Sequence, residues 1–513
     1  MNKLTSPIDD STNPDAHAME SIAIVGAGIC GLCCGLALAK NGYQVTLYER
    51  DVPLPEGEPD DIFFNWSRRG ASQFRHPHAF LAIMSNLLEE QFPDLMPKFF
   101  KAGARKITFQ DMLTDNLKNK YKPQPGDENL WLMMCRRATM EMVLRRYANQ
   151  QTNLTIQSST RVNAMISQPR PGGIEVTGLK IQKRQAGAQE ENVYADIIID
   201  AGGRNSKFKQ WFRLAGTPVF SEQNNAEIVY YTRHYQFLPG QEEPPRSSKT
   251  RSAGDLGYLK YGVFPGDGGH FAVIICVPLH EEDLHEYVKD SDAFDRICSH
   301  IPGLKPWVDP ALSKATTTSF GMGHIKTVWN HFVHQGTPLA LNYFAIGDAA
   351  LYTNPLYGRG CSTGIIHSHL LSKLLRDHHD PVERALVFDQ YTEQELRPIF
   401  KASLNEDKNG IKRAKAVLMG QPLNRARGFK KRLGLAFGDA LAKASQEQIH
   451  VLRGALKTFN LMEKPGEFLK DWHIRLTILR YMLMGRNQNA SNRIVPGPSR
   501  SEMLALMEDH KTA

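Results

Sequence analysis

The glycine-rich stretch over residues 21–50 constrains the fold of this chain more than any other feature. It opens with an apolar run at 22–25, which is typical of a buried parallel strand, and then turns through Gly26, Gly28 and Gly31 at GxGxxG spacing. An apolar helix and a second strand follow directly. Strand, glycine turn, helix and strand in this order predict a Rossmann-type unit in an α/β sheet.

The residue types in this unit match the chemistry of a bound dinucleotide. Gly26 permits the tight turn, Gly28 leaves room for a pyrophosphate beside the backbone, and Gly31 lets helix and strand pack closely. The helix N-terminus presents N–H groups and positive potential to phosphates. Glu49, at the end of the second strand, can accept hydrogen bonds from ribose hydroxyls. We therefore expect a dinucleotide site rather than a simple glycine-rich turn.

Two later segments also show a buried strand that ends in a glycine-rich turn. One spans 195–206 and the other spans 344–369. Ligands of open α/β sheets bind at the carboxyl ends of the strands, where these turns lie. In the turn within 344–369, amide groups and a following helix N-terminus could stabilise negative charge on a ring carbonyl. The candidate binding residues are Asp200, Gly202, Gly347, Asp348, Pro355, Gly358 and Gly360.

Basic residues cluster at two places between the first glycine-rich stretch (21–50, the first marker) and the second (195–206, the second marker). Arg137 stands where a strand enters a helix, a position from which it could meet a phosphate, although a surface arginine explains this feature alone more simply. The segment 67–78 is rich in arginine and carries His76 and His78. A functional loop and a solvated basic loop fit its composition equally well.

The charge distribution restricts the possible partners. The chain of 513 residues has a net charge of +8, and the segment 401–432, with ten basic and two acidic residues, alone carries the same net charge. A globally basic surface for nucleic acid is therefore not expected. The segment could dock an acyl carrier protein or an anionic membrane, or it could be a solvated helical face.

An apolar stripe lies further along the C-terminal region, at Trp472, Leu476, Leu479 and Leu483. This spacing predicts one face of a helix. Packing against its own domain is the usual use of such a stripe, while peripheral membrane contact or a partner protein stays open.

No apolar run reaches the length of a membrane-spanning helix, so no transmembrane segment is expected. Residues 1–20 are polar and lack the apolar core of an export signal, which predicts a disordered leader and a cytoplasmic protein. No metal site is expected, because no second Cys/His pair at ligand spacing accompanies Cys30 and Cys33.

The three glycine markers, in this order, resemble those of the FAD-dependent aromatic hydroxylases, or single-component flavin monooxygenases. Segments 67–78, 230–237 and 354–360 resemble a bacterial hydroxylase- or epoxidase-like subgroup. The resemblance implies an α/β fold: a glutathione-reductase-like FAD-binding Rossmann domain with an inserted β-sheet substrate domain and a C-terminal helical region. The expected divisions are 1–20 for the leader, 21–66, 130–215 and 335–400 for the FAD domain, 67–129 and 216–334 for the substrate domain, and 401–513 for the helical region.

The same resemblance implies FAD as the cofactor and assigns roles to the candidate residues. Glu49, with Arg50 beside it, would hold the adenosine ribose, Arg137 the phosphates, Asp348 the pyrophosphate–ribityl region, and 355–360 the isoalloxazine ring. Asp200-Ala201 departs from the family's Asp-Gly. Electrons from NADPH or NADH would therefore arrive either directly or through a separate flavin reductase.

The implied activity is the hydroxylation or epoxidation of a hydrophobic, aromatic or polyketide-like molecule of secondary metabolism, with O2 and through a flavin C4a-hydroperoxide. His76 or His78 would serve as proton donor or base. Relatives of the same fold leave other classes open: an FAD-dependent reductase or dehydrogenase acting on an isoprenoid or other alkene without O2, and a non-catalytic binding protein. A halogenase is disfavoured, since the sequence lacks the Trp-x-Trp-x-Ile-Pro segment typical of flavin halogenases.

Overall fold

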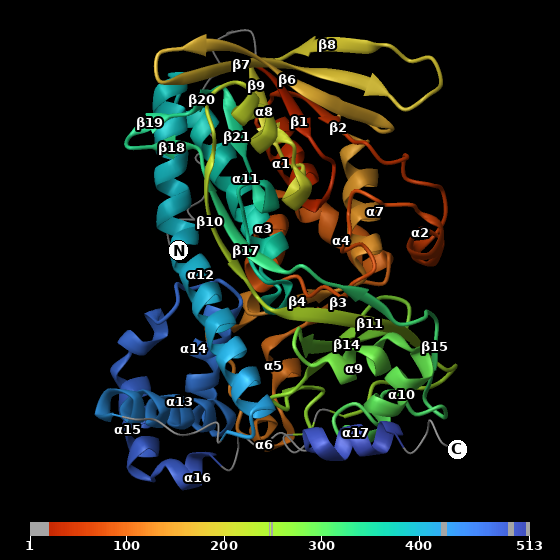
Figure 1. The fold of residues 1–513 in the computed structure, drawn as a ribbon, viewed down its shortest axis with the longest axis vertical. Coiled ribbons are helices and arrows are strands. Elements are labelled where there is room, and N and C mark those ends of the chain that lie inside the picture. Colours follow the sequence, from red (N-terminus) through yellow and green to blue (C-terminus); the bar gives the residue numbers. More distant parts are fainter. Residues whose placement is uncertain (1–19, 246, 248–249, 422–427, 491–496, 509–513) are drawn as a thin grey trace.

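A five-stranded parallel sheet forms the centre of the structure, a computed structural model that describes residues 20–245, 247, 250–421, 428–490 and 497–508 (Figure 1). The expected leader at 1–20 therefore lies outside the described residues except for its last one. The strand order is β21-β9-β1-β2-β5. The strands are β1 (Ser21–Val25), β2 (Gln44–Tyr48), β5 (Leu154–Gln157), β9 (Ile197–Asp200) and β21 (Tyr343–Ala345).

This sheet is buried on both faces, as its apolar strands predict. Ile24, Leu47 and Ile199 are fully buried in a core that also contains the helices of one face. The helices that share this core include α1 (Ile29–Lys40), α3 (Ala82–Gln91), α4 (Met96–Lys101), α7 (Arg137–Ala148) and α11 (Gly360–Asp377).

The other face packs against α8 (Phe208–Leu214) and a second sheet, which lies at the top of Figure 1. That sheet contains β6 (Thr160–Arg170), β7 (Gly173–Lys183), β8 (Glu190–Tyr194) and β20 (Ala340–Leu341). The parallel sheet is thus covered by helices on one side and mainly by β structure on the other, which makes the fold a mixed α/β architecture.

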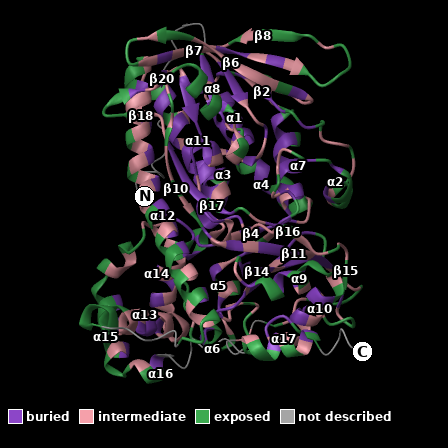
Figure 2. Cartoon of the chain, viewed as in Figure 1, coloured by how far each residue is buried: buried purple, intermediate pink, exposed green. Residues whose placement is uncertain are grey.

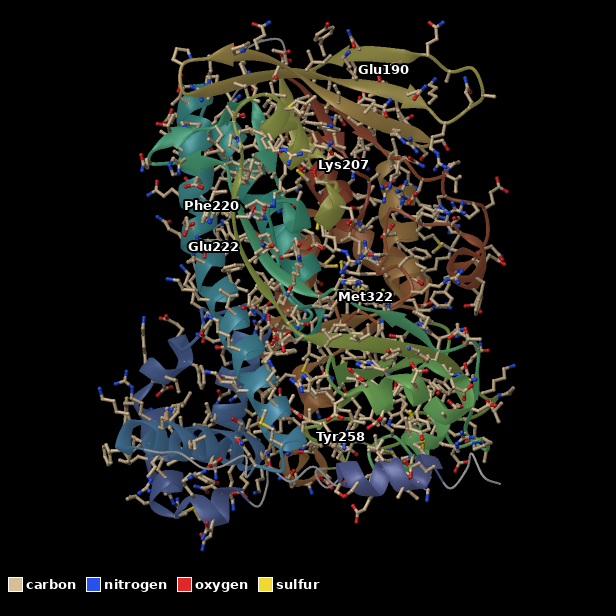
Figure 3. All side chains as sticks on the ribbon, viewed as in Figure 1. Glu190, Lys207, Phe220, Glu222, Tyr258 and Met322 are labelled. Atoms are coloured by element: carbon tan, nitrogen blue, oxygen red, sulfur yellow. The ribbon has the colours of Figure 1, made fainter. Side chains whose placement is uncertain are left out.

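A third sheet, which is antiparallel, lies below the carboxyl ends of the parallel strands (Figure 1). It contains β11 (Ile228–Phe237), β12 (Ala253–Asp255), β13 (Lys260–Pro265), β14 (His270–Pro278), β15 (Ser313–Ala315) and β16 (Phe320–Met322). Its far side packs against α9 (Glu282–Lys289), α10 (Ser291–His300) and α17 (Arg500–Glu508). Figure 3 shows Met322, on β16 of this sheet, where the sheet meets the parallel-sheet part of the molecule.

Smaller elements connect these layers. The short strands are β3 (Arg105–Ile107), β4 (Leu132–Met134), β10 (Phe220–Asn225), β17 (Lys326–His331), β18 (Val333–His334), β19 (Thr337–Pro338) and β22 (Leu351–Tyr352). The short helices are α2 (Pro59–Asn65), α5 (Phe109–Met112) and α6 (Asp115–Lys118).

The C-terminal part is helical and is joined to the rest by one long helix, α12 (Pro381–Leu418), which runs along the side of the molecule from the upper sheets to the lower region (Figure 1). The helices that follow are α13 (Phe429–Glu447), α14 (Ile449–Phe459), α15 (Trp472–Leu483) and α16 (Arg486–Ala490). Within the described ranges, every helix is too short or too polar to cross a bilayer.

Close packing of α1 against α11 depends on glycine, which leads to a stability prediction. A Cβ at Gly364 would lie 2.0 Å from Cys30 Sγ, so Gly364→Ala overpacks this contact and we expect it to destabilise the fold by about 1–3 kcal/mol. Urea unfolding followed by circular dichroism measures the effect.

The matched control is Gly434→Ala in α13, where an added Cβ meets nothing within 4 Å. Because alanine favours helix over glycine, this variant should gain about 0.5–1 kcal/mol. Equal unfolding midpoints for Gly364→Ala and the unaltered protein would contradict the packing argument.

Candidate functional site

A cavity lies where the carboxyl ends of β1, β9 and β21 face the lower antiparallel sheet. It encloses, with its mouth, about 1360 Å³ of open space. All three glycine markers contribute to its wall, although they are far apart in the sequence. The marker residues that line it are Gly28 from the first, Ala201 and Gly203 from the second, and Asp348, Pro355, Gly358 and Gly360 from the third.

The remaining marker glycines shape the turns behind the wall. A Cβ at Gly26, whose φ is +102°, would lie 2.6 Å from the carbonyl oxygen of Ala201, so glycine allows the first and second turns to meet. A Cβ at Gly31 would lie 2.0 Å from the carbonyl oxygen of Gly26. Gly202 donates its N–H to Asp200 within the second turn, and Gly347 has φ +54° and packs against Cys30.

Two helix N-termini point at this cavity. Gly28 and Ile29 line it at the start of α1, and Gly360 and Cys361 line it at the start of α11. Each helix start carries positive potential and free backbone N–H groups. Arg137 adds a charged side chain to the same wall. The geometry is that of a site for a doubly charged anion such as a pyrophosphate.

Arg137 is held in place by buried acids. Its Nε donates to Glu141 Oε1 at 2.7 Å, and Glu141 also contacts Arg68 at 3.0 Å. Burial opposes ionisation of Glu141, but the charges of Arg68 and Arg137 prevail and lower its pKa to about 2. Glu141 therefore remains charged over the working pH range and fixes the guanidinium group of Arg137.

Asp348 is a free acceptor in the cavity wall. Burial raises the pKa of its carboxyl, while the nearby charges of Arg137 and Arg204 lower it. Among the described residues, none donates a hydrogen bond to this carboxylate. A ligand hydroxyl at the start of α11 would supply the missing donor.

Glu49 lies at the end of β2, as predicted, but behind the cavity wall. Its carboxylate accepts from the N–H groups of Ala27 and Asp51, at 3.1 and 3.0 Å, and contacts Arg68 and Arg145, at 3.0 and 3.3 Å. Burial opposes ionisation of Glu49, and the two arginines outweigh it and lower its pKa. The protein itself thus occupies most of its acceptor capacity, and the ribose role stays a prediction. Arg50 is exposed, and its guanidinium lies 3.5 Å from the carbonyl oxygen of Arg69.

Asp200 stabilises the second turn from inside the protein. It accepts hydrogen bonds from the Gly202 N–H at 2.9 Å, from the Tyr343 hydroxyl at 3.2 Å and from the Ser206 hydroxyl. Burial nevertheless raises its pKa to about 6. The structure places Asp200 as a support for Ala201 and Gly203, which face the cavity.

The two histidines of the arginine-rich loop both line the cavity. His76 Nδ1 lies 2.9 Å from Thr232 Oγ1 on β11, and burial, with the charge of Arg204, lowers its pKa to about 4. His78 Nδ1 donates to the carbonyl oxygen of His76 at 2.8 Å, which leaves Nε2 facing Arg137 at 3.5 Å. Burial lowers the pKa of His78 to about 3. Both rings are therefore neutral at pH 7, and His78 is placed to orient Arg137.

Residues beyond the sequence markers anchor the third turn. Asp407, on α12, accepts from Asn354 Nδ2 at 2.7 Å and from the Tyr357 hydroxyl at 2.9 Å. Arg359 donates to Ser403 Oγ at 2.6 Å and contacts Glu406 at 3.1 Å. We call these contacts of Ser403, Glu406 and Asp407 with the third turn the clamp, and the sequence analysis did not predict it. The only available signal was spacing, since positions 403, 406 and 407 share one helical face.

The remaining wall of the cavity is mainly apolar. Its residues come from the antiparallel sheet, the third turn and the end of α14. They are Tyr230, Phe264, Ile274, Met322, Leu356 and Phe459. One end of the cavity thus suits an anion and the other suits a hydrophobic ring.

Comparison with known proteins supports the prediction made from the first glycine marker, at residues 21–50. The family model described as "FAD dependent oxidoreductase" matches residues 21–58. "Protein Rv3254" of Mycobacterium tuberculosis is 25% identical over 241 residues, covering 44% of this chain and 46% of that protein. The match thus spans less than half the length of that relative. A kynurenine 3-monooxygenase of Cryptococcus neoformans is 24% identical over 408 residues, covering 76% of this chain and 75% of that protein.

Solved structures share the overall fold. The flavin-dependent brominase Bmp2 aligns with a TM-score of 0.56 at 13% identity, over 92% of this chain and 100% of that one. PqsL of Pseudomonas aeruginosa, described as a probable FAD-dependent monooxygenase, aligns with a TM-score of 0.55 at 14% identity, over 81% of this chain and 99% of that one. At these identities the likeness shows the fold.

The clamp on the third turn generates a stability prediction. Asp407→Ala removes the acceptor for Asn354, Tyr357 and Thr327, and leaves buried donors unpaired. We expect a loss of about 3 kcal/mol in the free energy of unfolding, measured in urea. Glu406→Gln is the control, because Glu406 is 42% exposed in its ion pair and should cost less than about 1 kcal/mol. Equal losses in the two variants would contradict the clamp.

The raised pKa of Asp200 predicts how stability depends on pH. The folded protein holds this proton up to about pH 6, while the unfolded chain releases it near pH 4. As pH rises from about 4 to about 6, the protein should therefore lose up to about 3 kcal/mol relative to Asp200→Asn. Urea unfolding of both proteins across this range measures the difference.

Asp196→Asn is the control for this pH effect. Hydrogen bonds from Ser21 lower the pKa of Asp196, so its contribution is lost only as pH falls below about 4. A difference between Asp200→Asn and the unaltered protein that stays constant from pH 4 to pH 6 would refute the assignment.

Proposed function

We propose that this chain, which is an FAD-dependent oxidoreductase as its sequence predicts, is a monooxygenase that inserts one oxygen atom of O2 into a hydrophobic, aromatic or polyketide-like molecule. NADPH or NADH supplies the electrons, and the second oxygen atom leaves as water. The observation that carries the proposal is the convergence of three glycine turns and two helix N-termini on one cavity with an apolar far end.

The residues of the cavity fit FAD. The starts of α1 and α11, with Arg137, would bind the pyrophosphate, and Gly28 leaves room for it. Asp348, which lines the cavity, would accept a hydrogen bond from a ribityl hydroxyl. When bound, FAD supplies the electron transfer and the reaction with O2, and the protein supplies position and electrostatics.

The chain's own residues would prepare the reacting end. The turn at 355–360, held by Asp407, would line the isoalloxazine ring, and the N-terminus of α11 would stabilise negative charge there. The apolar wall would hold the substrate beside the ring and help to keep water away from it. His76, neutral at pH 7, would accept a proton from a substrate phenol, while His78 orients Arg137.

The finer assignments also belong to this proposal. They are the glutathione-reductase-like arrangement, the domain boundaries given above, the ribose role of Glu49, cofactor binding by Arg50, and a cytoplasmic location. The turn after Asp200 carries Ala201 where the family has glycine, so we propose that electrons arrive either directly from NAD(P)H or through a flavin reductase. Binding of an acyl carrier protein at 401–432, which lies partly outside the described residues, would show itself as salt-dependent association.

The absorption spectrum of the pure protein is the first test. We expect the yellow spectrum of a flavoprotein, bleaching by NAD(P)H with or without an added flavin reductase, and re-oxidation that yields product labelled from ¹⁸O2. Product formed without label would favour a reductase or dehydrogenase acting on an alkene. Halide-dependent product would favour a halogenase, the activity named for Bmp2. A colourless protein would contradict FAD binding.

The two histidines should respond differently to substitution. His76→Ala should lower coupled turnover by about tenfold or more with FAD still bound, because it removes a proton acceptor from the cavity. His78→Ala should instead weaken FAD binding, since Arg137 loses its neighbour. Product and H2O2 formation, with the FAD dissociation constant, separate the two effects. Full coupled turnover in both variants would show that neither histidine is catalytic.

A further inference from the structure

Helix α15 has two apolar faces, and the described part of the chain covers one of them and leaves the other exposed. Ile474, Ile478 and Tyr481 are buried in a small core formed with α13 and α14. The opposite face carries the stripe predicted from the sequence, and it is exposed. Trp472, Leu476, Leu479 and Leu483 expose 62%, 57%, 54% and 81% of their surface.

The exposure of the stripe bears on the three uses that the sequence left open, which are packing on its own domain, membrane contact and binding of a partner protein. The helix does pack against its own domain, but through other residues, so packing does not account for the stripe. The helix lies at the outer lower-left edge of the molecule (Figure 2). Singly exposed apolar residues are ordinary, but four in one continuous row indicate an interaction surface.

Cationic side chains border the stripe on both sides. At 100° per residue, Arg475 falls on one edge of the exposed face and Arg480 on the other, and both are exposed. Asp471, the acid at the start of the helix, accepts from the His473 N–H and caps the helix. An aromatic residue, a leucine row and flanking arginines form the pattern of a helix that lies in a membrane interface.

A second copy of this chain fits the surface less well. A helix of 12 residues is only about 18 Å long, and its exposed face is small beside the roughly 800 Å² per partner of a stable interface. A symmetric pair would also bring Arg475 and Arg480 of both copies together, which is repulsive. Anionic lipid headgroups complement the same arginines.

Helix α14 lies between α15 and the proposed substrate cavity. Thr477 Oγ1, on α15, lies 2.9 Å from His450 Nε2 at the start of α14. Phe459, nine residues further along α14, lines the cavity and is 44% exposed. That separation is about 14 Å along one helix.

We propose that α15 docks this protein on an anionic lipid surface, with the row Trp472, Leu476, Leu479 and Leu483 inserted among the headgroups and Arg475 and Arg480 bound to lipid phosphates. The contact is peripheral, and it needs no segment that spans the bilayer. The docking itself does not depend on the proposed oxygenase activity.

Sedimentation with lipid vesicles tests the proposal on the full-length protein with its cofactor bound. We expect binding to phosphatidylcholine vesicles that contain about one-third phosphatidylglycerol and much weaker binding to pure phosphatidylcholine. Raising the salt from about 0.1 M to about 0.5 M should release the protein. Absence of binding to the anionic vesicles, or equal binding to both kinds, would overturn the proposal.

Substitutions separate the two parts of the surface. Leu476→Asn with Leu479→Asn should lower the partition coefficient more than about tenfold, because two apolar side chains are lost. Arg475→Gln with Arg480→Gln should lower it about 25-fold on anionic vesicles only, at roughly a fivefold loss for each charge. Leu214→Asn with Leu279→Asn is the matched control, since both leucines are exposed but lie elsewhere.

Unchanged FAD absorbance and thermal unfolding show that the variants are folded. Vesicle binding that survives the leucine substitutions would overturn the assignment to α15. Analytical ultracentrifugation without lipid tests the alternative that a second copy of this chain binds the exposed row. A dimer that the leucine substitutions abolish would make the face an interface between two copies, and would also overturn the proposal.

Discussion

The close approach of α1 and α11 is the constraint on which the site depends. Both helices begin at the same cavity, so their N-terminal N–H groups and dipoles act on one small volume. This approach is possible because Gly347 and Gly364 leave room for Cys30, where any added Cβ would collide with the sulfur atom. Tight packing in the core thus produces the positive potential at the surface of the cavity.

A buried network of ion pairs fixes the position of Arg137, which adds its charge to this positive potential. Arg68 contacts Glu49, Asp51 and Glu141 at 2.9–3.0 Å, and Glu141 in turn holds Arg137. Burying so many charges is costly unless each has partners, and here the acids and bases alternate. The result is a rigid link from the end of β2 to the cavity. Anion binding then requires little further ordering of Arg137.

Much of this arrangement could be predicted from the sequence because its signals are local. GxGxxG after an apolar run predicts a strand, a turn and a helix whatever the rest of the chain does, and Asp348 and Gly358 follow a strand in the same way. The clamp on the third turn could not be predicted. Asp407 lies more than 50 residues from Asn354, and only the course of α12 brings them together.

The sequence by itself determined the α/β class, the three glycine markers and the apolar row of α15, since each depends on residues within one or two elements. The tertiary structure decided which side chains face a ligand and which face the protein. It placed Asp200 and Glu49 behind the cavity wall and brought His76 and His78 to it, and it left the row of α15 exposed as far as the described residues show. Burial and partner choice depend on contacts between distant segments, which no local pattern specifies.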